Sequence, residues 1–521
     1  MKNSKLKRIV ALVLSAVMLL SFASCGDSTE ETTTSYEVAE STTQAKTLAK
    51  APQNDDSDEQ TDERSDSLSN ENLRYVMIYN PKIYDEYLDY DDSALSTGYL
   101  GNQINIDGYR GDSLVQDFPF YSISQKDIMK DLDINIKLEN FRNDFISKVY
   151  NVGDVRNFYC FSENSMNIRV EKSFKCVYAG EHCHIWSEGK MDESVLQDYG
   201  KEFDKNIFNQ VVEMFGEPRF AGKTGRINLI FAEMQENVGG CFFRGDVFAT
   251  GEEDESWFKL NKFNTDHDIL FINSLIASTE ELQTYTYGTM AHEFQHLINM
   301  TNALSTYSFT ICRTWLDETM SGYIEEALYP GTQYFSRRYE SYNSSDYIRT
   351  GQSLYNFNND GNDIGVYGSV YFFSEYLKNL AGDSVFSKIH NYWRTCYEAV
   401  FSEATAIMNS VSSSVKAEIS NSVSYPDSWR FKTEEDEWLS KLVLDFYMSI
   451  LSNKDEIDAF DDVVPEALLY DEINAADIEG GGRIVVAVNG TTFEIPDEAD
   501  SGLIYVGLDE DFNAVTPFVF A

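Results

Sequence analysis

The sequence predicts an α+β protein with a β-rich N-terminal region, a mixed and largely helical central domain, and a small β module at the C-terminus. Segments rich in β-branched and aromatic residues are concentrated before residue 195 and after residue 478. Between them, apolar residues recur at the three- and four-residue spacing of amphipathic helices. The 521 residues are too many for one hydrophobic core, so several domains are expected.

Residues 1–25 are expected to be a lipoprotein signal peptide. A basic head precedes an apolar run, 9–22, that is too short to span a membrane comfortably. The run ends at small residues before Cys25, which resembles the lipobox of bacterial lipoproteins. That resemblance implies lipidation at Cys25 and an extracytoplasmic protein that is lipid-anchored to the cell membrane. Ordinary secretion is the alternative.

Residues 26–73 are predicted to be a disordered acidic tether. The segment is rich in Ser, Thr, Asp and Glu and poor in apolar residues. Such a segment cannot bury enough surface to offset the entropy of ordering, and its like charges extend it. The tether would hold the folded part of the chain away from the membrane.

Residues 74–195 are predicted to be a β-rich N-terminal domain, with strands at 155–161, 168–174 and 176–186. The central domain, 196–455, is predicted to begin with an amphipathic helix that Gly216 and Pro218 end. The apolar face of this helix is formed by Phe203, Ile207, Phe208, Val211 and Phe215.

Two buried strands are then expected, at 226–231 and 268–273. A capping box of Ser278 and Glu281 predicts the start of the next helix. Gly288 weakens that helix by roughly 1 kcal/mol relative to Ala, so tertiary packing must stabilise it. The chain is predicted to stay mostly helical to about residue 455. The small C-terminal β module is placed at residues 456–521, where glycine-rich turns separate strand patterns.

The charge balance excludes some partners. The formal net charge is −45 at pH 7. A surface that negative repels phosphate backbones, so nucleic acid is not an expected partner. It also repels anionic membrane surfaces, so attachment to a membrane needs a covalent or apolar anchor.

The helix that is expected to start at Ser278 carries the motif His292-Glu293-Phe294-Gln295-His296. Positions i and i+4 lie on one helical face, so His292 and His296 can bind the same metal ion. Glu293 lies beside them, where its carboxylate can act as general base toward water. Zn²⁺ is the expected cofactor because it accepts imidazole ligands in a tetrahedral shell and acidifies water.

A carboxylate on the following helix is expected to complete the metal site. Glu318 lies on a helix-like stretch, 314–326, and two histidines with one glutamate form a known catalytic zinc set with an open position. Glu325 and Glu326 are alternative ligands. A third histidine is not expected, because Asn302 occupies the position where that pattern requires one.

HEFQH followed by WLDETMSGYIEE, 315–326, resembles the gluzincin pattern, and most closely the hyicolysin family of bacterial metallopeptidases. The resemblance covers about residues 145–400 and includes YGSVYFF, 367–373. It implies a zincin-type catalytic domain in a secreted zinc endopeptidase. His292, His296 and Glu318 would be the zinc ligands, and Glu293 the general base.

The resemblance also implies a tyrosine, on a helix after the third ligand, that stabilises the oxyanion. Tyr367 is the candidate, with Tyr371 and His390 as alternatives, although His390 shares a helical face with apolar residues and favours a packing role. Two positions depart from the family pattern. Thr319 replaces a common glycine, and Gly322 stands where thermolysin-like relatives carry an aspartate that supports a ligand. Asp317 or Glu325 could supply that support.

The predicted function is therefore a cell-surface zinc metalloendopeptidase that acts on protein or peptide substrates. Substrate would align along a strand edge, formed by 239–243 or 268–273. The alternative is a non-catalytic binding lipoprotein on a peptidase scaffold. Glu293 argues against it, because a structural zinc site has no need of that carboxylate. An aminopeptidase is a lesser alternative, since no clear acidic anchor for a substrate amine is found.

Overall fold

A computed structural model shows helices and sheets in an α+β arrangement, which confirms the predicted fold class. It describes residues 67–82, 150–163, 165–218, 226–235, 238–243, 246, 264, 268–303, 313–332, 342–343, 351–355, 365–395, 402–426, 429, 431–453, 456–461, 463, 467–468, 478, 480–495 and 502–520. Cys25 and the expected signal peptide lie outside these residues. Within the described part of the chain, no helix has the length and apolar character needed to cross a membrane.

The larger described sheet has six strands in the order β3-β4-β5-β6-β8-β7. The strands are β3 (Val155–Ser162), β4 (Ser165–Ala179), β5 (Cys183–Ser187), β6 (Ile227–Ala232), β7 (Gly240–Cys241) and β8 (Ile269–Asn273). Strands β5, β6 and β8 run parallel, and β7 pairs antiparallel with β8 at the edge. Among the described strands, β7 therefore lies at the end of the sheet and is paired on one side only.

The single strand expected at 176–186 is two strands separated by a turn. Asp204 explains the turn, because its carboxylate accepts hydrogen bonds from the backbone N–H groups of Glu181 and His182 at 2.9 Å each. Asp204 lies more than 20 residues after the turn in the sequence. The local pattern of strand residues therefore does not predict this break.

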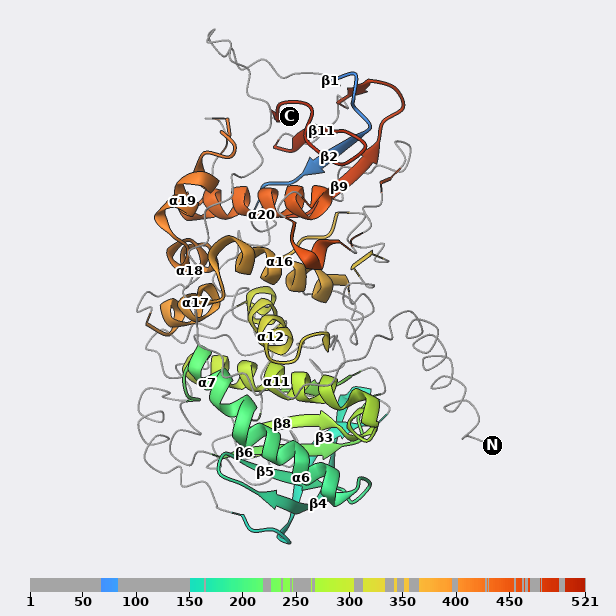
Figure 1. Ribbon diagram of the computed structural model, residues 1–521, viewed down its shortest axis with the longest axis vertical. Coiled ribbons are helices and arrows are strands. Elements are labelled where there is room, and N and C mark those ends of the chain that lie inside the picture. The colour runs from blue at the N-terminus through green and yellow to red at the C-terminus, as the bar shows by residue number, and fades with distance from the viewer. Residues whose placement is uncertain are drawn as a thin grey trace, which may run out of the picture. The chain divides into compact units, whose positions relative to one another are not determined.

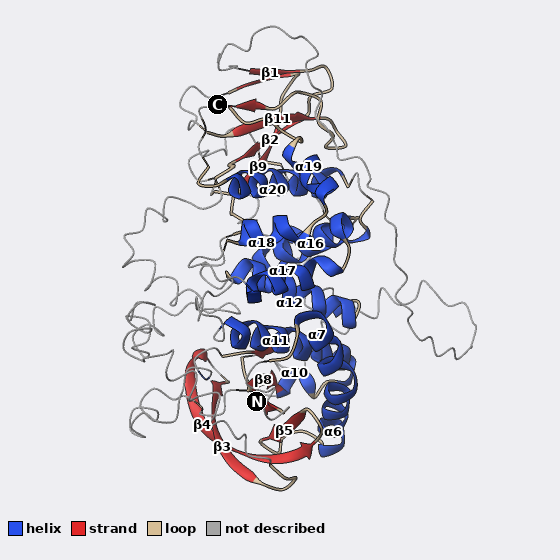
Figure 2. Ribbon diagram, turned by 90° about the vertical axis from the view of Figure 1, so that its left-hand side faces the viewer, coloured by secondary structure: helices blue, strands red, loops and turns tan. Residues whose placement is uncertain are grey.

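The central strands are buried on both faces, as expected for parallel strands covered on both sides. On β6, Leu229 and Phe231 face the cluster that includes the helices, whereas Ile230 belongs to a second cluster on the opposite face. Two helices, α6 (Glu193–Glu202) and α7 (Phe208–Phe215), cover the first face (Figure 2). The expected helix thus forms, interrupted by a π-helical turn, and ends at Gly216 with φ 79°.

The motif helix is α11 (Gln283–Ala303), which follows a short helix α10 (Ser274–Ala277) and a 3-10 turn. The expected capping box is not formed, because the Ser278 hydroxyl donates to the carbonyl of Leu275 at 3.0 Å. Close packing explains why residue 288 is glycine. A Cβ there would lie 2.7 Å from Cγ2 of Thr332 and 3.0 Å from Cγ of Glu325. Glycine therefore lets the next helix approach α11 closely.

The remaining helices form a series of neighbours that starts at α11 (Figure 1). Helix α12 packs on α11, α16 on α12, and α20 on α16, while α17 contacts both α7 and α11. Their bounds are α12 (Thr314–Leu328), α16 (Gly365–Ala381), α17 (Ser384–Thr395), α18 (Glu403–Ser410), α19 (Ser413–Ser420) and α20 (Glu434–Ser452). The helical region expected to reach about residue 455 is present.

A second sheet joins the beginning and the end of the folded chain. Its order is β12-β11-β2-β9, and a separate pair joins β1 to β10. The strands are β1 (Ser67–Ser69), β2 (Tyr75–Tyr79), β9 (Arg483–Ala487), β10 (Thr492–Glu494), β11 (Ile504–Leu508) and β12 (Val519–Phe520). This sheet contacts α20, where the Tyr79 hydroxyl donates to the carbonyl of Ser440 at 3.0 Å.

These pairings differ from the expected divisions of the chain. Strand β2, expected in an N-terminal domain of 74–195, is paired on both sides by strands of the C-terminal module, whereas β3 to β5 share a sheet with strands of the central domain. The end of the expected tether is also ordered, since β1 is paired and Leu73 is buried. The reason is that the partners of β1 and β2 lie some 400 residues away, where no local pattern reveals them.

Candidate metal centre

Two neighbouring helices bring three candidate metal ligands together. His292 and His296 lie one turn apart on α11, and Glu318 projects from α12. The two Nε2 atoms are 3.1 Å apart. His292 Nε2 lies 3.3 Å from Glu318 Oε2, and His296 Nε2 lies 3.4 Å from Glu318 Oε1. The sequence-predicted ligands therefore converge on one point.

The spacing and surroundings fit a tetrahedral zinc ion. Ligand atoms about 2.0–2.1 Å from such an ion are separated by about 3.3–3.4 Å. All three side chains are buried, and the two oxygens of Glu318 accept no hydrogen bond from the residues that the structure describes. A buried carboxylate is ordinarily hydrogen-bonded or bound to a metal. His292, His296 and Glu318 thus have the donor chemistry and placement to hold Zn²⁺.

Each imidazole is supported by a carboxylate on its other nitrogen. Asp317 Oδ2 lies 3.0 Å from Nδ1 of His296, and Glu325 Oε2 lies 3.1 Å from Nδ1 of His292. Both residues that the sequence offered as supports therefore contact the imidazoles. These contacts favour a proton on Nδ1 and direct the lone pair of Nε2 toward the shared point.

The two alternative ligands lie elsewhere. Glu325 faces the Nδ1 side of His292 rather than the shared point. Glu326 accepts hydrogen bonds from the N–H of Gly331 at 2.6 Å and from the hydroxyl of Thr332 at 3.2 Å. Among the three acids considered from the sequence, Glu318 alone has both oxygens facing the imidazoles.

The electrostatics of the site favour positive charge. Burial would lower the pKa of His292, but Glu318 and Glu325 outweigh it and raise the pKa to about 9. Burial likewise opposes protonation of His296, yet Asp317 and Glu318 raise its pKa well above the usual value. For Glu318, burial would raise the pKa, but the two imidazoles hold it below its ordinary range. A metal cation would replace the protons that these groups attract.

Glu293 is buried beside the ligands and is held by the edge of the sheet. Its Oε2 accepts a hydrogen bond from the backbone N–H of Phe242 at 2.7 Å. Burial raises the pKa of Glu293, while the nearby imidazoles act in the opposite direction. A raised pKa makes this carboxylate a better proton acceptor at neutral pH than an ordinary glutamate.

The edge strand is β7, one of the two segments considered from the sequence. Segment 268–273 lies inside the sheet, because β8 pairs with β6 on one side and β7 on the other. A Cβ at Gly240 would lie 2.7 Å from Cγ2 of Thr289 and 3.1 Å from Cγ of Glu293. Glycine therefore allows the edge strand to lie against the motif helix, beside the general-base candidate.

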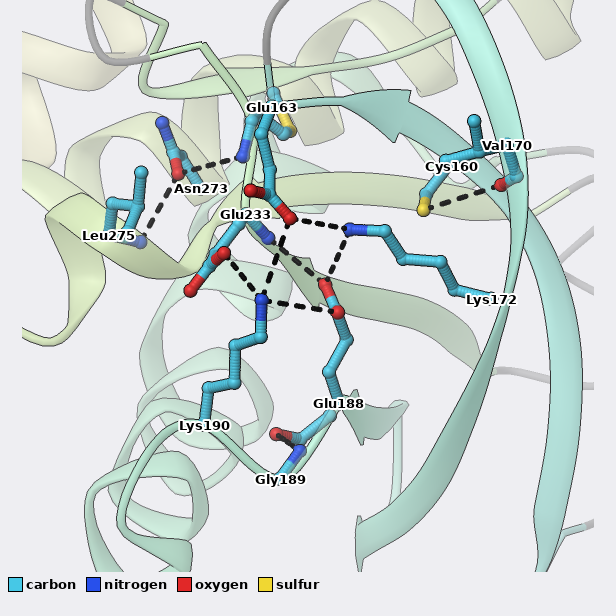
Figure 3. A network of polar contacts seen from close by, with 12 residues as sticks. Cys160, Glu163, Val170, Lys172, Glu188, Gly189, Lys190, Glu233, Asn273 and Leu275 are labelled. Carbon is cyan, nitrogen blue, oxygen red and sulfur yellow. Dashed lines mark hydrogen bonds and ion pairs between the residues drawn. The ribbon is translucent and has the colours of Figure 1, made fainter.

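Polar contacts hold the described residues that lead into β7, and Figure 3 shows the ion pairs of Lys190 with Glu188 and Glu233 among them. Asn273, at the end of β8, donates from Nδ2 to the carbonyls of Gln235 at 2.9 Å and Val238 at 2.7 Å. At the start of the loop, Glu233 pairs with Lys190, whose ammonium also lies 3.7 Å from Glu188. The segment carrying Phe242 is thus anchored from the strands on which the sheet is built.

The structure places the three candidates for an oxyanion-stabilising donor in two different environments. His390 is completely buried, and its two ring nitrogens face Asn299 and Asn302 of α11. Tyr367 and Tyr371 both lie on α16, the helix that packs on α12, and both are half-buried. The role of Tyr367 stays a prediction.

Two groups at the site have little or no sequence signal. The N–H of Phe242 is a backbone group, so no residue type identifies it. Asn299 donates to Asp317 and is three residues after His296, a spacing that places both on one helical face. Asn299 could have been found by extending the helical face beyond the second histidine.

Comparison with known proteins supports a distant relationship. The chain is 24% identical over 262 residues to the neutral metalloprotease ShpI of Staphylococcus hyicus, which covers 46% of this chain and 55% of ShpI. The chain thus spans about half the length of that relative. No family model matches the chain.

Proposed function

We propose that this protein is a zinc-dependent metalloendopeptidase whose catalytic group is built on α11 and α12. The observation that carries the proposal is the convergence of His292, His296 and Glu318 at tetrahedral spacing, directly beside the buried carboxylate of Glu293. A site with a purely structural ion would not need that carboxylate. The similarity to a neutral metalloprotease supports the same reading.

The residues divide the chemistry among them. When bound, the zinc ion supplies Lewis acidity toward water and the substrate carbonyl. Glu293, held through Oε2 by Phe242, takes a proton from the attacking water and passes it to the leaving amine nitrogen. Strand β7 offers main-chain groups along which an extended peptide aligns. Tyr367 is proposed to donate its phenolic proton in a hydrogen bond to the developing oxyanion.

The decisive comparison is between the wild-type chain and Glu293→Gln, which keeps size and polarity but removes the base. Both proteins are incubated with a denatured protein, with and without a chelator, and their zinc content is measured. We expect equal zinc content and a rate about 100- to 10,000-fold lower for Glu293→Gln, the range typical of general-base loss. A Tyr367→Phe variant measured in parallel tests the oxyanion donor.

Three outcomes count against the proposal. Equal cleavage by wild type and Glu293→Gln would remove Glu293 from the mechanism. Cleavage that survives removal of metal would remove zinc. Stepwise N-terminal trimming instead of internal fragments, read by mass spectrometry of the products, would indicate an aminopeptidase and not an endopeptidase.

We also propose that the protein is held at the outer face of the cell membrane by a lipid on Cys25. The motif before Cys25 supports this proposal. Cells that express wild type or Cys25→Ser are labelled with a radioactive fatty acid and fractionated. Wild type is expected to carry label in the membrane fraction, and Cys25→Ser to carry none. Equal label in both proteins would exclude Cys25 as the attachment site.

A further inference from the structure

A buried chain of polar side chains leads away from the metal centre to α17. Asp317, which contacts His296, accepts a hydrogen bond from Asn299 through its Oδ1. Asn299 Oδ1 lies 3.1 Å from Nδ1 of His390, and Asn302 Nδ2 lies 3.2 Å from its Nε2. Each of these side chains is at most 3% exposed. The chain therefore runs through the protein interior, between α12, α11 and α17.

The direction of the hydrogen bonds in this chain is determined by chemistry. An ionised carboxylate only accepts, so Asn299 must turn its NH₂ toward Asp317 and its oxygen toward His390. That oxygen also only accepts, so His390 must donate from Nδ1. In the neutral ring, Nε2 is then an acceptor, which matches the facing Nδ2 of Asn302.

We propose that His390 is a positioning residue of the metal centre. By donating from Nδ1 it holds the amide of Asn299 in the orientation that donates to Asp317, and Asp317 in turn orients His296. The inference rests on the proposed zinc site. It adds to that site a residue that acts through two intermediaries, Asn299 and Asp317.

Packing alone does not account for this histidine. His390 contacts the ring of Phe215 edge-on, with centroids 5.6 Å apart, and an apolar side chain would serve that contact as well. Burying an imidazole is unfavourable unless its nitrogens are hydrogen-bonded. Here both nitrogens face amide groups of α11, on the helix that carries two of the three candidate ligands.

Two amide substitutions test the two ring nitrogens of His390 one at a time. In His390→Asn, the amide sits at the distance of Nδ1 from the backbone and can still donate to Asn299. In His390→Gln, the amide sits at the distance of Nε2 and reaches toward Asn302 instead. The variants differ by one methylene and carry the same polar group. They therefore form a matched pair for the Nδ1 contact.

The experiment uses the full chain and Zn²⁺ itself as the probe. The zinc dissociation constant is measured by competition with a chromogenic chelator, and the melting temperature is measured on metal-free protein. We expect His390→Gln to bind zinc about tenfold more weakly than wild type, the lower end of the effect of outer partners of metal ligands. His390→Asn is expected to bind within about threefold of wild type.

A double-mutant cycle tests whether His390 acts on the zinc site through Asn299. If His390 acts through Asn299, then Asn299→Leu combined with His390→Gln should weaken zinc binding no more than Asn299→Leu alone. If the losses of zinc affinity in the two single variants add up in the double variant, His390 does not act through Asn299. The proposal would be overturned if His390→Asn and His390→Gln bound zinc with equal affinity. This applies if both affinities match that of wild type. It applies equally if both affinities are lower and the melting temperatures of both metal-free variants are lower too. Wild type that binds no zinc would instead refute the proposed function itself.

Discussion

At the scale of single residues, the site is an arrangement of carboxylates around two imidazoles. Each imidazole faces Glu318 with one nitrogen and a supporting acid with the other, Asp317 for His296 and Glu325 for His292. Without a metal ion, this negative surrounding attracts protons to the rings, as the raised pKa of both histidines reflects. Protons and zinc therefore compete for the same atoms.

This competition predicts proton release on zinc binding. At pH 7 the metal-free protein keeps His292 protonated, because its pKa is about 9. Zinc binding should then release protons and strengthen as the pH rises toward that value. Titration calorimetry in buffers of different ionisation enthalpy measures the number released. A binding enthalpy that is independent of the buffer would contradict the prediction.

The same raised pKa predicts how the stability of the metal-free protein depends on pH. Because the folded pKa of His292 lies above its unfolded value, the stabilisation is fully present below about pH 6.5. It is lost as the pH rises through about 9. Melting temperatures of metal-free protein should fall across this window, whereas those of zinc-loaded protein should not follow them.

At the scale of elements, the site depends on how closely α11 and α12 approach. Gly288 lies where these helices meet, against Glu325 and Thr332. It reduces the intrinsic stability of α11, but it makes room for the side chain that supports His292. Gly240 has a similar role on the other side of α11, where it lets β7 lie beside Glu293. Two glycines thus set the spacing around the motif helix.

Gly288→Ala should therefore weaken the site although it favours the helix. Alanine gains roughly 1 kcal/mol of helix propensity. Its Cβ would lie 2.7 Å from Thr332 Cγ2 and 3.0 Å from Glu325 Cγ, so one of them must move. We expect about tenfold weaker zinc binding through the displaced Glu325. Chelator competition checks this.

The matched control for that substitution adds Thr332→Ala, which removes the nearer methyl group. The double variant should recover part of the lost zinc affinity, because Glu325 can then keep its position. Zinc affinity of Gly288→Ala equal to that of wild type would show that the contact of α11 with α12 does not limit the site.

At the scale of the whole molecule, the sheet that joins β2 to the C-terminal strands connects the chain ends to the helices. Strand β2 lies between β9 and β11 and packs on α20, which contacts α16. Helix α16 in turn packs on α12, the helix of Glu318. The C-terminal strands therefore stabilise the helices next to the metal centre rather than forming a separate appendage.

Removing residues 478–521 should consequently destabilise more than the tail. Strand β2 would lose both neighbours, and the hydroxyl of Tyr447 would lose its acceptor, the carbonyl of Gly481. We expect a lower melting temperature and faster proteolysis within α20. A chain that ends at residue 517 is the control, because it removes only β12 and leaves β2 paired. Identical melting curves for all three chains would refute this coupling.

The sequence by itself determined the fold class, the helices that carry the candidate ligands, and the residues proposed for the metal site. Helical spacing is local, so HEFQH and the stretch around Glu318 could be recognised without coordinates. Tertiary structure decided which acids support the imidazoles, which segment is the sheet edge, how β2 is paired, and that His390 bonds to Asn299. The physical reason is that these features are contacts between residues tens to hundreds of positions apart, or involve backbone groups. Neither leaves a local pattern of side chains along the chain.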